Sequence, residues 1–395
     1  MSHSKTEPTN ISAREFSEKA IAVASHYGFV AKEKVFSQKG RKLKTKIKNP
    51  DILLKKTDVF SGELGEIVKM YISRHSIPLS DPAFIYHNSA TSKMVRFCLT
   101  IIGIEKSIAE ALILKTALAI LGDVGFKETS VHINSIGDKN SATAFARELN
   151  VYLKKRAVDM PVNCREALKQ NAFYAFELLK RKHNPIHEDI PRSMEFLSDS
   201  GRRHLREVLE YLEAVDIPYE INSKLIGHKD CYSQTLFEIR NNASDAHSKN
   251  KVVLAYGGRC DEIAQQLFRL PVPAVGILFE WTPKGVRDTV LKIKSVTHRP
   301  KVYLVQLGFK ARFHSLAIIE TLRMARVPFR QSINSDLLTS QLETATMLKI
   351  PYAIILGQRE VIDNTVIIRN MDSQSQKTIP IDTLSEYVKT LGAKK

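Results

Sequence analysis

The chain has 395 residues, of which 43% are hydrophobic and 26% charged; these values are ordinary for a globular protein and favour two or three domains. The formal net charge is +17 and the pI is about 9.6, an excess that favours a polyanionic partner, most often nucleic acid, over a merely basic protein. The four cysteines are irregularly spaced and form no CxxC pair, which argues against a zinc site or a disulfide framework and predicts no metal.

The N-terminal part is predicted to begin with a helix over residues 12–27. Ser12 starts it, and Glu15 stands at the spacing of a capping box. Residues 27–36 have the composition of a strand. The lysine-rich run 38–56 alternates lysine with Leu, Thr and Ile, which suits an edge strand or a mobile hairpin. As a cluster, this run is equally well explained as an RNA contact or as a solvated face.

No segment is predicted to enter a membrane. Residues 1–16 contain no apolar stretch of the kind found in signal peptides. The most apolar stretch, 110–121, is too short for a membrane span and carries Lys115, so it is predicted to be buried within a helix at 105–122. We therefore expect a cytoplasmic protein without a membrane partner.

The middle of the chain changes from strand to helix and back. A strand at 130–136 precedes a helix at about 140–155, and residues 155–215 are helical and polar. In the last of these helices, four apolar residues recur at helical spacing and predict one buried face: Leu205, Val208, Leu209 and Leu212. Three strands are predicted to follow, at about 218–224, 230–240 and 250–256.

The last unit is separated from the rest by a linker. Residues 284–300 are rich in Lys, Arg and Thr and end in Pro300, as linkers commonly do. After the linker, the order strand–helix–strand–helix–strand predicts parallel pairing with right-handed crossovers, and hence a small α/β domain. Its second helix is predicted to be capped at Ser335, and residues 364–382 to form a closing hairpin.

Three motifs give this last unit a resemblance to a known family. They are SLAIIETLR at 315–323, LLTSQLETA at 337–345 and IILGQREVIDNTVIIRNM at 354–371. In this pattern, a helix ending in LR, a helix with QL and Ala, and an ILGxxE turn follow one another. The unit resembles the anticodon-binding domain of class II aminoacyl-tRNA synthetases.

The middle of the chain resembles one member of that class, the histidyl-tRNA synthetases. The motifs that carry the resemblance are INSIGD at 133–138, KLIGHKDCYSQTLFEI at 224–239 and LAYGGRCDEI at 254–263. They are similar to the family's strand-to-insertion junction, its histidine-site segment and its AGGRYD turn. The resemblance is strongest from about 218 to 392.

The resemblance implies a two-part architecture. We expect an α+β class II synthetase-like core, an antiparallel sheet with helices, over residues 1–290 with a helical insertion at about 140–215. A linker at 291–300 then leads to an anticodon-binding-like α/β domain at 301–395. Because the family dimerises through its core, a homodimer is expected.

The resemblance also implies an amino-acid pocket. Tyr232 matches the second tyrosine of the family's DYY motif, and Gly257 and Gly258 match the AGGRYD turn, where glycine permits close backbone approach or a positive φ. Glu63, in SGELGEIVKMY, matches the glutamate of the family's RPE motif. Taken alone, a strand tyrosine is more often a core residue, and the two glycines are explained at least as well by a tight turn.

The arginines that should face ATP are missing from this pattern. Adenylate formation builds negative charge on the α-phosphate, and arginine binds phosphate with two parallel hydrogen bonds. Gly227 stands where the family's histidine-site motif has an arginine, and Thr282 and Pro283 stand where a later motif has Glu and Arg. The segment 85–103 has no FRxE motif, and Leu99 stands near the expected glutamine. We therefore assign no catalytic residue.

We predict a histidyl-tRNA-synthetase-like protein that binds tRNA or another structured RNA without efficient aminoacylation and needs no cofactor. An active histidine–tRNA ligase that uses ATP and Mg is the first alternative, because His228, Lys229 and Lys284 lie near the gaps and could act as point charges. A synthetase-like regulatory subunit of histidine biosynthesis is the second, but such regulators usually lack the unit at 301–392.

Candidate RNA contacts are five arginines of the last unit: Arg323, Arg326, Arg330, Arg359 and Arg369. Taken singly, an arginine of this kind is more often a solvated surface charge than an RNA contact. Arg359 is favoured because it follows a strand of an α/β sheet, where loops beyond the strand ends commonly bind ligands.

Overall fold

The structure is a computed structural model, and only part of the chain is described by it. The described residues are 11–37, 59–73, 82–90, 94–242, 252–269, 271–281, 299–331, 333 and 335–391. The lysine-rich run 38–56 lies outside them, as do Thr282, Pro283 and Lys284 and most of the predicted linker. Predictions on these residues therefore stay predictions, as do the domain boundaries.

The predicted first helix is confirmed as α1 (Ala13–His26), and its N-cap Ser12 accepts a hydrogen bond from the backbone N–H of Glu15. The strand predicted over residues 27–36 is wrong. Only β1 (Val30–Ala31) pairs with a neighbouring strand, and the chain then forms α2 (Lys32–Ser37). The sequence Lys-Glu-Lys that opens α2 consists of good helix formers, which explains the change.

The core is an eight-stranded sheet that is antiparallel from β2 to β4, with β1 and β5 added in parallel at its two edges. In spatial order the strands are β1, β2 (Ala83–Ala90), β3 (Val95–Ile102), β8 (Ala274–Trp281), β7 (Val253–Arg259), β6 (Ser233–Asn241), β4 (Thr129–Gly137) and β5 (Tyr219–Ile221). Since β6 begins at Ser233, residues 225–232 form a loop and not part of a strand.

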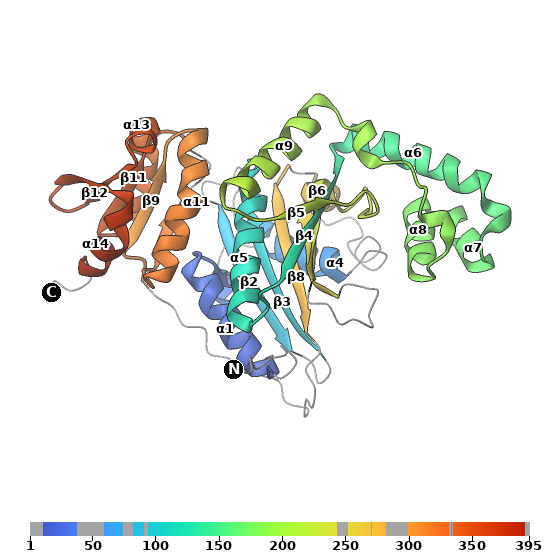
Figure 1. Cartoon of the computed structure of the whole chain (residues 1–395), viewed down its shortest axis with the longest axis horizontal. Helices are drawn as coiled ribbons and strands as arrows, with labels where there is room; N and C mark the ends of the chain where they lie inside the picture. Colours follow the sequence, from blue (N-terminus) through green and yellow to red (C-terminus); the bar gives the residue numbers. More distant parts are fainter. Residues whose placement is uncertain are drawn as a thin grey trace, which may run out of the picture.

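Helices cover both faces of this sheet (Figure 1). One face packs on α1, α5 (Ile108–Val124) and α9 (Asp199–Ala214), and the other on α4 (Val59–Ile72) and α10 (Asp261–Phe268). Strand β3 shows the alternation that this requires, since Phe97 and Leu99 belong to the first cluster and Cys98 to the second. The face with α4 is the one on which the candidate site lies.

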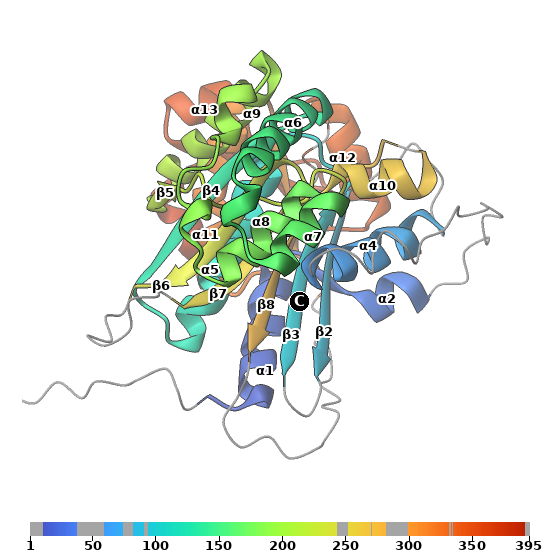
Figure 2. The same ribbon diagram turned by 90° about the vertical axis from the view of Figure 1, so that its right-hand side faces the viewer.

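A helical insertion projects from the end of β4 (Figures 1 and 2). It contains α6 (Lys139–Lys155), α7 (Val162–Gln170) and α8 (Ala172–Arg181). These helices have an apolar cluster of their own around Phe145 and Phe176, which are fully buried. Helix α9 then returns the chain to the sheet. The helices predicted over this region are present, and the insertion as a domain division stays a prediction.

The C-terminal unit is a five-stranded sheet in the order β10-β9-β11-β12-β13. Its strands are β9 (Val302–Gln306), β10 (Phe329–Gln331), β11 (Tyr352–Leu356), β12 (Thr365–Asn370) and β13 (Gln376–Pro380). Its helices are α11 (Phe309–Met324), α12 (Leu338–Met347), α13 (Gln358–Ile362) and α14 (Leu384–Thr390). The first three strands are parallel and the last two form the predicted hairpin, so the predicted α/β form is confirmed. Helix α12 starts later than predicted, and Ser335 is not its N-cap.

The C-terminal unit packs on the core through α11, which contacts α1, α5 and α9. At this junction the Tyr27 hydroxyl donates a hydrogen bond of 2.6 Å to Glu320 Oε2. Arg330 Nη1 donates to the carbonyl of Gly28 at 2.6 Å. The predicted combination of an antiparallel core and an α/β tail is confirmed. Within the described part of the chain, every helix is too short or too polar to cross a bilayer.

Candidate functional site

A cavity of about 550 Å³ lies between helix α8 of the insertion and strands β6, β7 and β8 of the core sheet. The loop before β6 forms one wall with Gly227 and His228, and Tyr232 lines the cavity next to it. The insertion is tied to this loop, because Asn171 Nδ2 and His228 Nε2 are 2.6 Å apart. The histidine-site segment singled out in the sequence therefore lines a real cavity.

The side chain of Tyr232 fills the space that a side chain at position 227 would need. A Cβ atom at Gly227 would lie 2.3 Å from Tyr232 Cδ2 and 2.5 Å from Leu236 Cδ2, both too short for any real contact. Tyr232 is only 4% exposed, and its ring stacks on Phe60 at a centroid distance of 5.9 Å. An arginine at position 227 therefore has no room unless this packing is broken.

Gly257 and Gly258 are needed for close strand approach. A Cβ at Gly257 would lie 2.1 Å from the carbonyl oxygen of Gly276, and one at Gly258 would lie 2.5 Å from that of Thr235. Neither glycine has a positive φ. A Cβ at Gly258 would also lie 3.1 Å from Tyr232 Cδ1, so the tyrosine ring is held between two glycines. Of the two reasons that the sequence offered, close backbone approach is the correct one.

Glu63 on α4 lies against Arg96 on β3. The motifs of the sequence assigned no role to Arg96. Arg96 Nη1 lies 3.9 Å from Glu63 Oε1, and Arg96 Nε donates to Glu280 Oε1 at 3.0 Å. The other oxygen of Glu280 accepts a hydrogen bond of 3.0 Å from Tyr256. Glu280 and Tyr256 line the cavity, whereas Glu63 is set back from it. The signal in the sequence was an arginine that is the one charged residue of β3.

The described residues that line the cavity carry no excess of positive charge. Among the described lining residues, the carboxylates are Glu177, Glu238 and Glu280. Lys180 and Arg181 supply positive charge, and both come from α8 of the insertion. Glu238 is neutralised in addition by Arg240, at 2.7 Å.

Leu99 does not line the cavity. It belongs to the apolar cluster on the α1 and α5 side of the sheet, so its side chain lies on the opposite face. The absence of glutamine at that position is therefore no argument about the cavity. The cavity-side neighbours on β3 are Arg96 and Cys98.

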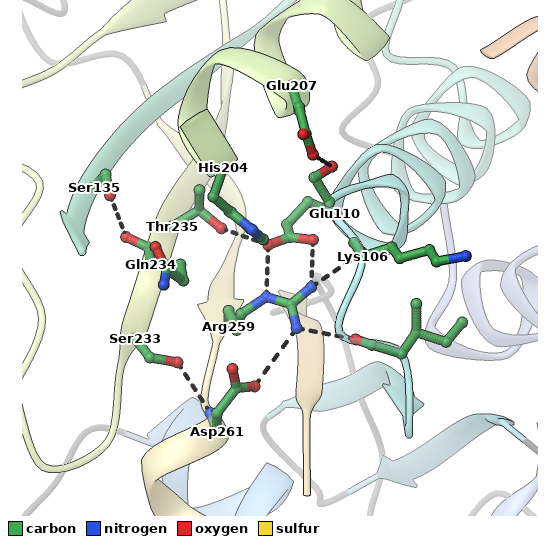
Figure 3. Close-up of polar contacts among 12 residues, drawn as sticks. Lys106, Glu110, Ser135, His204, Glu207, Ser233, Gln234, Thr235, Arg259 and Asp261 are labelled. Atoms are coloured by element: carbon green, nitrogen blue, oxygen red, sulfur yellow. Dashed lines mark hydrogen bonds and ion pairs between the residues drawn. The ribbon is translucent and has the colours of Figure 1, made fainter. Parts of the chain in front are cut away.

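A buried ion pair joins β7, the strand that carries Gly257 and Gly258, to α5 (Figure 3). Arg259 Nε donates to Glu110 Oε1 at 2.7 Å and Nη2 donates to Glu110 Oε2 at 2.6 Å, and both side chains are at most 1% exposed. His204 Nε2 and Thr235 Oγ1 reach the same Glu110 oxygen at 2.6 and 3.0 Å. Arg259 Nη1 also donates to the carbonyl of Ile104 at 3.0 Å. Arg259 of the GGRCD motif therefore anchors the strand end and does not face the cavity.

The ionisation of this pair follows from its geometry. Burial opposes the charge on Glu110, but Arg259 and His204 outweigh burial and hold the pKa of Glu110 well below its usual range. Burial likewise opposes the charge on Arg259, and Glu110 outweighs it and raises the pKa of Arg259. Both groups are charged at neutral pH. One signal of this pair is visible in the sequence, namely an isolated glutamate at the start of an apolar helix.

The five arginines predicted to contact RNA do not form one surface. Arg359 follows the C-terminal end of β11, whereas Arg369 pairs with Ala353 near the start of that strand. Arg359 is 89% exposed and lies 3.5 Å from Asp363, and Arg326 is exposed as well. For Arg326, Arg359 and Arg369, contact with RNA stays a prediction.

Arg323 and Arg330 already have partners within the chain. Arg323 Nη2 pairs with Glu320 at 2.6 Å, and Nη1 lies 3.7 Å from Asp123 of α5. Arg330 holds the carbonyl of Gly28 at the junction between the two units. Both residues therefore contribute to docking the C-terminal unit, whether or not they also contact RNA.

Comparison with known proteins gives consistent matches. Residues 301–391 match the family described as the anticodon binding domain. The chain is 25% identical to the histidine–tRNA ligase of Dehalococcoides mccartyi over 396 residues, which cover 93% of each chain. It is 28% identical over 309 residues to the chloroplastic histidine–tRNA ligase of Porphyra purpurea, covering 76% of this chain and 70% of that one.

Two solved structures align over most of the chain. The apo histidyl-tRNA synthetase of S. aureus aligns with a TM-score of 0.48 and 19% identity, covering 95% of both chains. A protein described as an ATP phosphoribosyltransferase regulatory subunit/histidyl-tRNA synthetase, from Bacillus halodurans C, aligns with a TM-score of 0.41 and 13% identity, covering 90% of this chain and 99% of that one.

A helix-covered, mainly antiparallel sheet followed by an anticodon-binding domain defines the chain as a class II synthetase-like protein. The relatives that align over most of its length narrow this class. Over most of its length the chain is similar to histidine–tRNA ligases.

Breaking the buried ion pair should destabilise the fold strongly. We expect Glu110→Leu and Arg259→Met each to lower the free energy of unfolding by about 3–5 kcal/mol, since each leaves a buried charge unpaired. The double variant should lose at least about 2 kcal/mol less than the sum of the single losses. Urea denaturation measures all three.

The exposed pair Lys169–Glu166, 2.8 Å apart, provides the control, and its coupling should stay below about 1 kcal/mol. Additive losses at Glu110 and Arg259 would show that the pair is not coupled.

The same carboxylate predicts a dependence of stability on pH. Because the pKa of Glu110 is depressed in the folded state, its contribution is complete above the ordinary glutamate pKa of about 4.3 and is lost as the pH falls toward the folded value. Glu110→Gln lacks this contribution. The difference in unfolding free energy between the native chain and this variant should therefore shrink from about pH 5 to about pH 3. A constant difference would contradict the ionised pair.

Proposed function

We propose that this protein binds tRNA or another structured RNA and does not aminoacylate it efficiently. The observation that carries the proposal is the closure of position 227 by Tyr232. A phosphate that develops charge needs a preorganised cation, and loss of one such contact costs about 10²–10³ in rate. At the place where the resemblance calls for an arginine, this chain has a glycine without space for one.

The charge around the cavity supports the same view. Arg96 and Arg240 are nearby arginines, but each is bound to a carboxylate, Glu280 and Glu238 respectively. A guanidinium engaged in this way offers fewer hydrogen bonds to a phosphate. The anticodon-binding domain at 301–391 and the net charge of +17 support RNA as the partner.

An active histidine–tRNA ligase with ATP and Mg is the second candidate. Lys180 and Arg181 favour it, because they line the cavity from the insertion and could replace the missing arginines. The full-length similarity to histidine–tRNA ligases favours it too. The proposal further includes a homodimer and a cytoplasmic location, which the resemblance suggests, and assigns no cofactor to the RNA-binding role.

Two assays on the full chain separate these candidates. We expect no histidine-dependent ATP–pyrophosphate exchange above background, because position 227 has no room for a phosphate-binding arginine. We expect retention of tRNA that falls by about 10³-fold or more between about 50 and 200 mM salt, as for a protein that contacts several phosphates. Robust exchange would establish the ligase. Histidine binding without exchange or RNA retention would favour a regulator.

Arg359→Gln refines the RNA assay. If Arg359 contacts a phosphate, this variant should reduce the slope of log affinity against log salt by about 1. Arg14→Gln is the matched control, since Arg14 is 73% exposed and forms a similar ion pair within one helix turn, with Glu18. Equal effects of the two variants would remove Arg359 as a specific contact.

A further inference from the structure

A groove with a volume of about 640 Å³ lies where helix α9 of the core meets helices α11 and α13 of the C-terminal unit. Helix α11 contacts both of the others (Figure 1). Apolar side chains from all three helices line the groove, namely Ala214, Phe309, Phe313, Val361 and Ile362. None of these residues belongs to the candidate site or to the predicted RNA contacts.

Part of this apolar surface is exposed in the single chain. Ile362 is 71% exposed and Phe309 is 39% exposed. The rings of Phe309 and Phe313 pack on Tyr211 of α9 at centroid distances of 5.3 and 5.9 Å, so α9 holds both rings at the groove. Single exposed apolar residues are common, but apolar groups gathered in one groove are typical of a surface that binds a partner.

Charged groups line the groove on both sides of the two phenylalanines. Glu210 and Glu213 come from α9, and Lys310 and His314 come from α11. Successive residues of an α-helix are about 100° apart. Because the phenylalanines face α9, Lys310 and His314 lie farther from α9 than the phenylalanines do. Glu213 also accepts a hydrogen bond of 2.7 Å from the Tyr219 hydroxyl, which leaves its charge in place.

These charges define the kind of partner that the groove fits. A helix lying in it meets carboxylates on one flank and a lysine on the other, so its own flanks have to carry the opposite charges. At physiological salt, charges more than about 10 Å away are screened. The carboxylates of α9 therefore determine the local preference, although the chain as a whole carries a net charge of +17.

The described helices of this chain do not supply such a partner. Helices α1, α4, α5, α6, α8, α9 and α11 bury their apolar faces within the chain. Helix α12 leaves Leu338 and Met347 exposed, but it contains no basic residue that could pair with Glu210 or Glu213. A described helix of a second copy therefore does not fit the groove, which points to another protein as the occupant.

We propose that this groove binds an amphipathic α-helix of a partner protein. The apolar stripe of that helix packs on Phe309 and Phe313. Basic side chains on one flank pair with the two carboxylates of α9, and acidic side chains on the other flank pair with Lys310. A helix fills such a groove with apolar anchors spaced at i, i+3, i+4 and i+7. The inference goes beyond the proposed function, because it assigns a protein partner to a surface that the RNA proposal does not use.

Two synthetic peptides of about 20 residues, long enough to form a helix in water, test the proposal on the full chain by fluorescence anisotropy. The first has a leucine stripe with lysines on one flank and glutamates on the other. The second has the same stripe with glutamines on both flanks. We expect the first peptide to bind about tenfold more tightly, because it forms several surface ion pairs that the second lacks. Equal affinities, or no binding of either peptide, would overturn the proposal.

Ile362→Lys places a charge in the apolar part of the groove and should weaken both peptides about tenfold or more. Met324→Lys is the matched control, because Met324 is 69% exposed on α11 and does not line the groove. Both positions are exposed, so we expect both variants to fold. Peptide binding that the two variants weaken equally would refute the groove as the site.

Glu210→Gln tests the charge pairing separately. It should weaken the peptide with charged flanks about threefold and leave the glutamine-flanked peptide unchanged, since one surface ion pair is lost. A merely structural role of Glu210 would weaken both peptides alike. An unchanged affinity for the charged peptide would contradict the pairing.

Other occupants of the groove give different results. If a second copy fills it, Ile362→Lys should lower the native mass in sedimentation, whereas Met324→Lys should not. If RNA fills it, Ile362→Lys should weaken the retention of tRNA. Either result without peptide binding overturns the proposal. Because peptide binding requires neither ATP nor tRNA, this proposal and the proposed function can fail separately.

Discussion

The packing of one tyrosine ring determines what the candidate site can do. Tyr232 lies between the glycines at 227 and 258 and stacks on Phe60, and it is almost completely buried. Glycine at both positions is a steric requirement, because a Cβ atom at either would meet the ring or the neighbouring backbone. The same packing therefore leaves no room for an arginine at position 227, which is the basis of the proposed loss of aminoacylation. On the proposed function, a synthetase-like scaffold persists while its phosphate-binding chemistry is lost.

The rest of the molecule supports this arrangement from two sides. On the α5 side of the sheet, the ion pair between Glu110 and Arg259 fixes the end of β7, the strand that carries Gly257 and Gly258. In front of it, the insertion places Lys180 and Arg181 at the cavity and contacts the loop through Asn171 and His228. The two lining cations are balanced by carboxylates, so the cavity has no excess of positive charge, although the chain as a whole has a large one. On the proposed function, the net charge serves RNA on the outer surface and not ATP in the cavity.

Much of the fold could be predicted from the sequence, because it depends on local patterns. The apolar face of α9, the alternation of strands and helices after residue 300 and the polar helices of the insertion are all visible as periodicities. The pairing of Glu110 with Arg259 could not be predicted, since it joins residues 149 positions apart that fall on different elements. The glycine at 227 was visible, but the ring that makes it necessary was not. The arginines at 323 and 330 were visible as charges, while their use in docking the two units depends on tertiary contacts.

The most direct test of the central claim is the stability and activity of variants at position 227. Gly227→Ala should lose about 1–3 kcal/mol of unfolding free energy through overpacking against Tyr232, and Gly227→Arg should lose at least as much and show no histidine-dependent exchange. Gly62→Ala is the matched control, because a Cβ there meets nothing within 4 Å and the change should be neutral or stabilising. A Gly227→Arg chain as stable as the native one, with histidine-dependent exchange gained, would contradict the account.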